Sequence, residues 1–148
     1  MKIKWLGHAC FQLTTSKNTL ILIDPADFKG YHLPHNLSPN IVTISHNHID
    51  HNKIDKLNGK PEILRGCSAR NNKFQFIDTT IIDVRIYNIK SFHDKGHHGD
   101  NAIFILEFDD IRIAHFGDIG ILLTEDQINK IGKLDVVMIP VGIITISA

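Results

Sequence analysis

The chain has 148 residues, 43% of them hydrophobic, and its 16 Lys and Arg residues balance its 16 Asp and Glu residues. This length predicts one compact domain, residues 1–148, with a core of its own. A net charge of zero lacks the basic excess of nucleic-acid and membrane-surface proteins. No apolar run approaches the roughly 18–20 residues that span a bilayer. Two cysteines without a signal peptide, Cys10 and Cys67, predict reduced thiols and a cytoplasmic protein.

The first part of the chain predicts short strands joined by turns. Apolar runs favour strands at residues 2–6, 11–14, 20–23 and 41–45. Residues 26–40 contain Gly30, Pro34 and Pro39, which is typical of a loop. Residues 49–57 predict a short helix that ends near Asn58-Gly59.

The second part is also rich in predicted strands. They cover residues 62–64, 74–77, 80–89, 102–108, 111–115 and 135–139. The dipeptide Asp109-Asp110 indicates a hairpin turn between two of them. Residues 124–131 predict a helix, with Thr124 as N-cap and Gln127 as its capping-box partner. Periodicity alone indicates a mixed α and β domain with many strands.

The run His46-Asn47-His48-Ile49-Asp50-His51 directly follows a predicted buried strand. Neutral imidazole is the commonest protein metal ligand, and carboxylates complete many zinc and iron sites. Four such donors leaving one strand suit two metal ions about 3.5–4 Å apart, as in two-metal hydrolases. A solvated histidine-rich loop is the simpler alternative for the run taken by itself.

Several segments in a fixed order resemble the metallo-β-lactamase superfamily of metal-dependent hydrolases, in the branch that includes the UlaG-like lactonases. These are Trp5-Leu6-Gly7-His8-Ala9, Asp24-Pro25, the histidine run, Ser91-Phe92-His93-Asp94, Asn101-Ala102, His115-Phe116-Gly117-Asp118 and residues 135–142. The resemblance implies an αββα sandwich of the α/β (α+β) class, with metal at one edge of two packed sheets. It also implies hydrolysis by a metal-activated water.

By this resemblance, His46, His48 and His93 hold the first metal ion. Asp50 and His51 contribute to the second ion, and Asp118 bridges the two. The cofactors expected are therefore two divalent ions. Zinc is the first expectation for histidine and carboxylate donors, and manganese and iron accept the same ligands.

Asp50 and His115 are the candidate catalytic residues. Asp50 is placed to orient the attacking water or accept its proton, and Asp50, His115 or a metal-bound water is the candidate acid for the leaving group. His8, on the first hairpin turn, is a candidate contact to substrate or to a ligand. Asp24 is expected to stay off the metal, and either to orient a histidine ligand by a hydrogen bond or to cap the loop that follows it.

The resemblance further implies a segment beyond this chain that supplies a last histidine to the second metal site. No histidine follows His115, so the expectation is a sandwich that is incomplete at its C-terminus. An unpaired sheet edge and an uncovered apolar face favour self-association, which predicts a homo-oligomer.

Three functional hypotheses stay open from the sequence. The first is a metal-dependent hydrolase acting on an ester, lactone or phosphodiester bond of a small molecule. The second is a metal-binding but catalytically inactive fragment of such a domain. The third is a nuclease of the same superfamily, against which the balanced charge argues. Substrate choice is expected to depend on the loops at residues 26–40 and 94–100.

Overall fold

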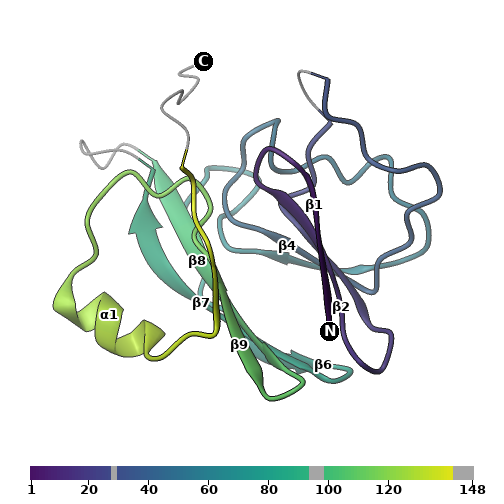
Figure 1. Cartoon of the computed structure of the whole chain (residues 1–148). Coiled ribbons are helices and arrows are strands. Elements are labelled where there is room, and N and C mark those ends of the chain that lie inside the picture. Colours follow the sequence, from purple (N-terminus) through teal and green to yellow (C-terminus); the bar gives the residue numbers. More distant parts are fainter. Residues whose placement is uncertain (28–29, 94–98, 142–148) are drawn as a thin grey trace.

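Two five-stranded sheets form the molecule (Figure 1). The computed structural model describes residues 1–27, 30–93 and 99–141. The first sheet has the strand order β1-β2-β3-β4-β5, and the second has the order β10-β9-β8-β7-β6. The strands of the first sheet are β1 (Lys2–Gly7), β2 (Cys10–Thr14), β3 (Leu20–Ile23), β4 (Ile41–Ile44) and β5 (Glu62–Arg65). Those of the second are β6 (Asp78–Ile81), β7 (Val84–Phe92), β8 (Asp100–Phe108), β9 (Ile111–His115) and β10 (Val136–Met138).

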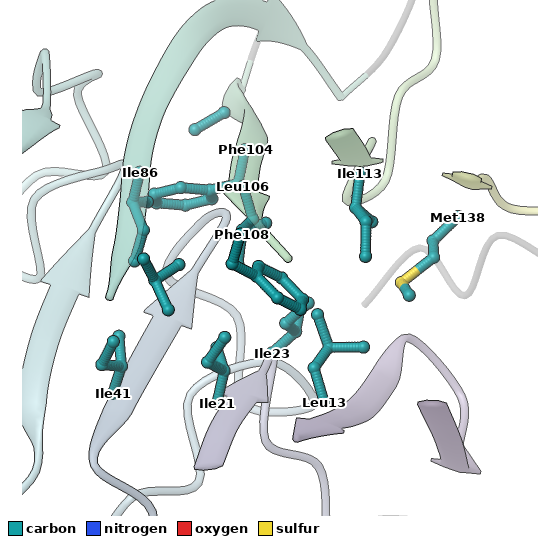
Figure 2. Packing of buried hydrophobic residues seen from close by; sticks show 12 residues of the cluster. Leu13, Ile21, Ile23, Ile41, Ile86, Phe104, Leu106, Phe108, Ile113 and Met138 are labelled. Atoms are coloured by element: carbon teal, nitrogen blue, oxygen red, sulfur yellow. The ribbon is translucent and has the colours of Figure 1, made fainter. Parts of the chain in front are cut away.

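The main hydrophobic core lies between the two sheets. Ile21 and Ile23 on β3 face Phe104 and Leu106 on β8, as Figure 2 shows, and all four side chains are fully buried. Successive residues of a strand point to opposite faces, so the residues between them serve the outer faces. Each sheet therefore carries apolar side chains on its outer face as well as its inner face. Each outer face needs a layer of chain that covers it.

One outer layer is a helix and the other consists of loops. Helix α1 (Glu125–Ile131) lies against β7 and buries Ile131 in one cluster with Ile89 of β7 and Ile103 and Ile105 of β8. The outer face of the first sheet is covered by loop residues, among them Leu37 and Ile54. The predicted two-sheet sandwich is confirmed, with loops in place of one helical layer in the part of the chain described here. No helix in those residues is long and apolar enough to cross a membrane.

The predicted helix at residues 49–57 is wrong, because this segment forms two separate turns. Its amides bond elsewhere: the Lys53 N–H donates to Pro25 O at 2.9 Å. The Asn58 N–H, just beyond, donates to Leu37 O at 2.8 Å. Asn and Asp residues, which populate this segment, also compete with helical hydrogen bonding. The segment therefore follows the adjacent loop instead of closing a helix.

The predicted strand at residues 74–77 is also wrong, apart from a single bridge between Phe74 and Cys67. Side chains hold this backbone where a neighbouring strand would. Asp100 accepts from the Phe74 N–H at 2.8 Å, and Asn88 accepts from the Ile77 N–H at 2.9 Å. The apolar pattern therefore marked a segment that packs against the sheet without joining it.

The predicted strand at residues 80–89 is two strands, β6 and β7, joined by a tight turn at Ile82 and Asp83. Ile82 has φ of 57°, a conformation that a β-branched residue rarely adopts, so the sequence carried no turn signal. Asp83 secures the turn by accepting hydrogen bonds from Thr15 at 2.8 Å and Thr19 at 2.5 Å.

Other local predictions are confirmed. Asp109 and Asp110 both have positive φ, at 53° and 57°, as a two-residue hairpin turn of the I′ type requires. Thr124 caps α1, and its side chain and that of Gln127 form the reciprocal capping box. Asp and Asn tolerate positive φ, and Thr and Gln satisfy free amides at a helix start.

Candidate metal centre

Ligand-type side chains from both sheets meet at one end of the sandwich. His8 lies in the β1–β2 turn, residues 46–51 follow β4, His93 follows β7, and Asp118 follows β9. The potential donor atoms form three sets, within each of which all atoms lie within 4.8 Å of one another. The sets are His46, His48 and His93; His8, His51 and Asp118; and Asp24, His46 and His51.

The first set consists of imidazoles alone. The Nε2 atom of His46 lies 3.0 Å from Nδ1 of His48, and the ring of His93 lies 5.2 Å and 5.0 Å from those two rings. Burial lowers the pKa of His46 to about 3, with a further contribution from His51. A neutral ring keeps a nitrogen lone pair free for a cation. This set is suited to the first metal ion.

His51 is prepared as a ligand by its neighbour. Its Nδ1 lies 2.8 Å from the Asp24 carboxylate, which confirms the supporting hydrogen bond predicted for Asp24. Its side chain is 0% exposed, and Nε2 makes no well-formed hydrogen bond with the described residues, although Asp118 Oδ2 lies 3.3 Å away. Once the ring is neutral, a carboxylate on Nδ1–H fixes the tautomer with the lone pair on Nε2. A buried nitrogen without a partner is costly, and a metal ion at this point would satisfy it.

Asp118 lies between the two groups of histidines. Its Oδ2 atom is 3.3 Å from Nε2 of His51 and 3.4 Å from Nε2 of His93. Burial opposes the charge, but His51 and His93 outweigh it and hold the pKa of Asp118 below its usual value. One ionised oxygen shared by both groups has the position that a bridging ligand requires. The bridging role itself stays a prediction.

The spacing of the donors fits divalent ions. Zinc bonds of about 2.0–2.2 Å place two ligands about 3.3–3.5 Å apart at tetrahedral angles and about 3 Å apart at right angles. The separations of 3.0 Å in the His46 and His48 pair, and of 3.3 Å and 3.4 Å around Asp118, agree with these values. Imidazole and carboxylate donors suit Zn²⁺ and also accept Mn²⁺ or iron.

Asp50 lies beside this cluster and is partly exposed. Its Oδ2 lies 3.1 Å from Nε2 of His8, and its Oδ1 lies 4.0 Å from Nε2 of His51. The hydrogen bond with His8 is the main reason that the pKa of Asp50 falls to about 2, against the effect of burial. The carboxylate is therefore ionised at neutral pH. That state suits the predicted role of metal ligand, whereas the low pKa makes Asp50 a weak proton acceptor and leaves it no proton to donate as an acid.

His115 occupies a supporting position. Its Nδ1 accepts from the Gly117 N–H at 3.3 Å, which leaves Nε2–H to donate to Ala9 O at 3.1 Å. Burial lowers the pKa of His115, so the ring is neutral at neutral pH. Both ring nitrogens have protein partners, and the ring joins the β1–β2 turn to the segment before Asp118. The predicted proton-transfer role of His115 stays a prediction.

Asn101 is a site-forming residue that sequence reasoning did not single out. Its Oδ1 accepts from the Asp118 N–H at 3.2 Å, and its Nδ2 donates to Phe116 O at 2.9 Å. Gly117 has φ of 56°, and a Cβ there would lie 2.3 Å from Asn101 Oδ1. The sequence signal for this contact was the Gly117-Asp118 pair. Only glycine at position 117 permits both the positive φ and the close approach of Asn101.

Residues 94–98 of the loop predicted to influence substrate choice lie outside the described residues, as do residues 142–148. The other predicted substrate loop, residues 26–40, is described except for residues 28–29. It packs Leu37 into the outer core of the first sheet. Its Tyr31 ring lies against Gly7 at the start of the β1–β2 turn. This loop therefore adjoins the turn that carries His8.

Metal binding is expected to release about one proton per chain near pH 7, from His51. Burial alone would lower the pKa of His51, but Asp118 and Asp24 raise it to about 10. The metal-free ring is therefore protonated at neutral pH, and its affinity for metal should increase as the pH rises toward 10. Calorimetric titration with Zn²⁺ in buffers of different ionisation enthalpy measures this proton. Release of no proton would contradict a protonated His51.

The comparisons with known proteins agree with this geometry. The family model described as "Beta-lactamase superfamily domain" matches residues 2–148. A UPF0173 metal-dependent hydrolase of Methanospirillum hungatei is 30% identical over 96% of this chain and 70% of its own length. One from Methanoculleus marisnigri is 29% identical over 96% of this chain and 69% of its own length.

Solved structures show the same fold. A proposed zinc-dependent hydrolase of the metallo-beta-lactamase superfamily from Thermotoga maritima is 31% identical, with a TM-score of 0.70. The match covers 91% of this chain, which spans 58% of the length of that protein. The diiron β-hydroxylase CmlA of Streptomyces venezuelae, at 14% identity and a TM-score of 0.61, shares the fold alone. The family match over nearly the whole chain, joined to the histidine and aspartate cluster, shows that this protein belongs to the beta-lactamase superfamily, together with relatives named metal-dependent hydrolases.

Proposed function

We propose that this chain binds two divalent metal ions, most readily Zn²⁺, and hydrolyses an ester, lactone or phosphodiester bond of a small molecule. One observation carries the proposal: the Asp118 carboxylate lies between the ring nitrogens of His51 and His93. A single ionised oxygen between two groups of ligand-type side chains is the arrangement that holds two cations side by side.

Different residues of the chain would hold the two ions of such a site. His46, His48 and His93 would hold one ion, Asp50 and His51 the other, and Asp118 both. When bound, the ions lower the pKa of a water from about 15.7 toward about 7 and polarise the bond to be cleaved.

Two residues at the edge of the centre prepare it for that reaction. In the metal-free chain a hydrogen bond with His8 keeps Asp50 ionised, and with the ions bound Asp50 would orient the water. Asp24 fixes the orientation of His51 from behind.

The expected partner is a small molecule, with nucleic acid as the less favoured substrate. The 16 basic residues are matched by 16 acidic ones, whereas nucleic-acid enzymes usually carry a basic face. We also propose a cytoplasmic setting, supported by Cys10 and Cys67, which are both free and buried as reducing compartments allow.

Metal content and hydrolysis, measured on the same preparation, test the proposal. Metal-free protein is reconstituted with Zn²⁺ or Mn²⁺, freed of excess ion and analysed for metal per chain. It is then assayed on a nitrophenyl ester, a lactone, bis-nitrophenyl phosphate and single-stranded DNA. About two ions per chain, with chelator-sensitive turnover above that of free ion, would support the hydrolase.

The remaining outcomes identify the alternatives. Bound metal without turnover on any substrate would indicate the inactive metal-binding domain. Turnover on DNA alone would indicate the nuclease.

We further propose that the chain forms a homo-oligomer. Strands β1 and β10 are at the edges of their sheets, and several of their apolar side chains face solvent, with Trp5 at 58% and Val137 at 50% exposure. Unpaired edges and exposed apolar groups favour association. Light scattering of the chromatographed protein measures its mass. A monomer at all concentrations tested would contradict this expectation.

A further inference from the structure

We infer that His8 is a direct ligand of the second metal ion, together with Asp50, His51 and Asp118. The inference rests on the two-metal centre proposed above and assigns one more residue to it. His8 belongs to the β1–β2 turn, about forty residues before the histidine run in the chain, and the fold brings its ring into the cluster.

The positions of the donor atoms support this assignment. Ligand atoms of His8, His51 and Asp118 all lie within 4.8 Å of one another. The Nε2 atom of His8 is 3.1 Å from Oδ2 of Asp50, within the range expected for two ligands of one ion. Its ring meets the ring of His51 edge to face, with centroids 5.0 Å apart. Four donors thus surround one small volume.

The donor count is compatible with this assignment. A zinc ion in a protein takes four or more ligands in all. Asp50, His51 and Asp118 supply three of them to the second ion, and His8 is the remaining histidine whose nitrogen reaches this set among the described residues. His51 Nε2 is buried and lies 3.3 Å from Asp118 Oδ2, within the same set of donors.

The turn that carries His8 is held in place. His8 has φ of 51°, in the left-handed region, and its carbonyl accepts a hydrogen bond from the Trp5 indole at 2.8 Å. The preceding Gly7 has φ of 109°, and a Cβ there would lie 2.1 Å from the Tyr31 ring. Backbone and aromatic contacts therefore direct this histidine toward the cluster, as a positioned ligand requires.

A hydrogen bond from His8 to Asp50 is the alternative that the same distance allows. In that case His8 would stabilise the Asp50 charge from outside the coordination sphere. The two roles differ in one measurable length. As a ligand, Nε2 lies about 2.0–2.1 Å from the second ion, whereas an outer partner lies well beyond that distance.

The test combines a metal titration with a structure of the loaded protein. The full chain, His8→Asn and the control His35→Asn are stripped of metal and titrated with Zn²⁺ against a chromophoric chelator. Asn tolerates the left-handed backbone at position 8, and His35 is an exposed loop histidine. The wild type and control should bind two ions. His8→Asn should bind the first ion normally and the second ion at least about 10–100-fold more weakly. That is the usual cost of losing even a residue that only hydrogen-bonds to a metal ligand.

Crystals of the Zn²⁺-loaded wild type, located by anomalous scattering, then measure the distance from His8 to the second ion. A bond of about 2.1 Å supports the inference. Two ions with His8 outside bonding distance, or unchanged affinity in His8→Asn, would overturn it and leave the hydrolase proposal intact. A wild type that binds fewer than two ions would overturn both. Circular dichroism of each metal-free variant establishes that the fold is retained.

Discussion

Asp118→Asn is expected to weaken the binding of both metal ions and to reduce metal-dependent hydrolysis by at least about 100-fold. The Oδ2 atom of Asp118 faces His51 at 3.3 Å and His93 at 3.4 Å, so one substitution removes a charged donor from each ion. Loss of an outer-shell partner alone costs roughly 10–100-fold in affinity or activity, and loss of a shared ligand should exceed that. Zn²⁺ titration and turnover at saturating metal measure the two effects.

A matched control separates loss of the ligand from loss of a surface charge. Asp126 is 73% exposed on α1, where it pairs with Lys130, and Asp126→Asn should leave both metal sites and turnover unchanged. If Asp118→Asn weakened the binding of only one ion, Asp118 would be a ligand of that ion and not a bridge between the two. Normal binding of both ions would place Asp118 outside the centre.

Much of the fold follows from local sequence because each strand of the sandwich carries its own pattern. Buried strands such as β4 and β8 are rich in apolar residues, with a continuous apolar run at Ala102–Leu106 of β8, and the Asp109-Asp110 turn is encoded by residues that tolerate positive φ. The errors arose where tertiary contacts replaced local ones. Side chains of Asn88 and Asp100 hold residues 74–77, and Ile82 turns the chain without a turn residue. The residue pattern within those segments gives no indication of these tertiary contacts.

The centre was predictable in part because its ligands come in recognisable groups. The run from His46 to His51 can be recognised from the sequence alone as a candidate metal-binding cluster, and family resemblance adds His93 and Asp118. The position of His8 is different, since it depends on how the β1–β2 turn meets the loop after β4, a contact between segments far apart in the chain. Asn101 was missed for the same reason: its hydrogen bonds to the Asp118 segment exist only in the packed sandwich.

Asp24→Asn is expected to destabilise the metal-free protein by about 3–5 kcal/mol, the usual cost of breaking a buried charged pair. Asp24 is fully buried and accepts from the Ser45 N–H at 2.7 Å, from the Ser45 hydroxyl at 2.5 Å and from His51 at 2.8 Å. An amide nitrogen in place of one oxygen would face a donor and leave His51 without its carboxylate. The free energy of unfolding in urea, measured with chelator present, tests this.

The pH dependence of that loss has a definite sign. Burial would raise the pKa of Asp24, but His51, His115 and His46 lower it below the ordinary value of 3.8. A carboxyl group with a lowered pKa stabilises the fold above its unfolded-state pKa and loses that contribution as the pH falls through the folded one. The difference in stability between wild type and Asp24→Asn should therefore be full at pH 7 and shrink in acid. A difference that stayed constant into acid would mean that the Asp24 charge is not its cause.

Asp24→Asn should also lower the affinity for the second metal ion by about 10–100-fold. The hydrogen bond from His51 to Asp24 sets the tautomer that leaves Nε2 available to the ion. Asp55→Asn, at a 65% exposed side chain, is the control for both measurements. Lower stability with unchanged affinity for both ions would show that Asp24 supports the fold and not the ligand. Weaker binding of the second ion with normal binding of the first would instead locate the effect at His51, since the first ion is proposed to lie on His46, His48 and His93.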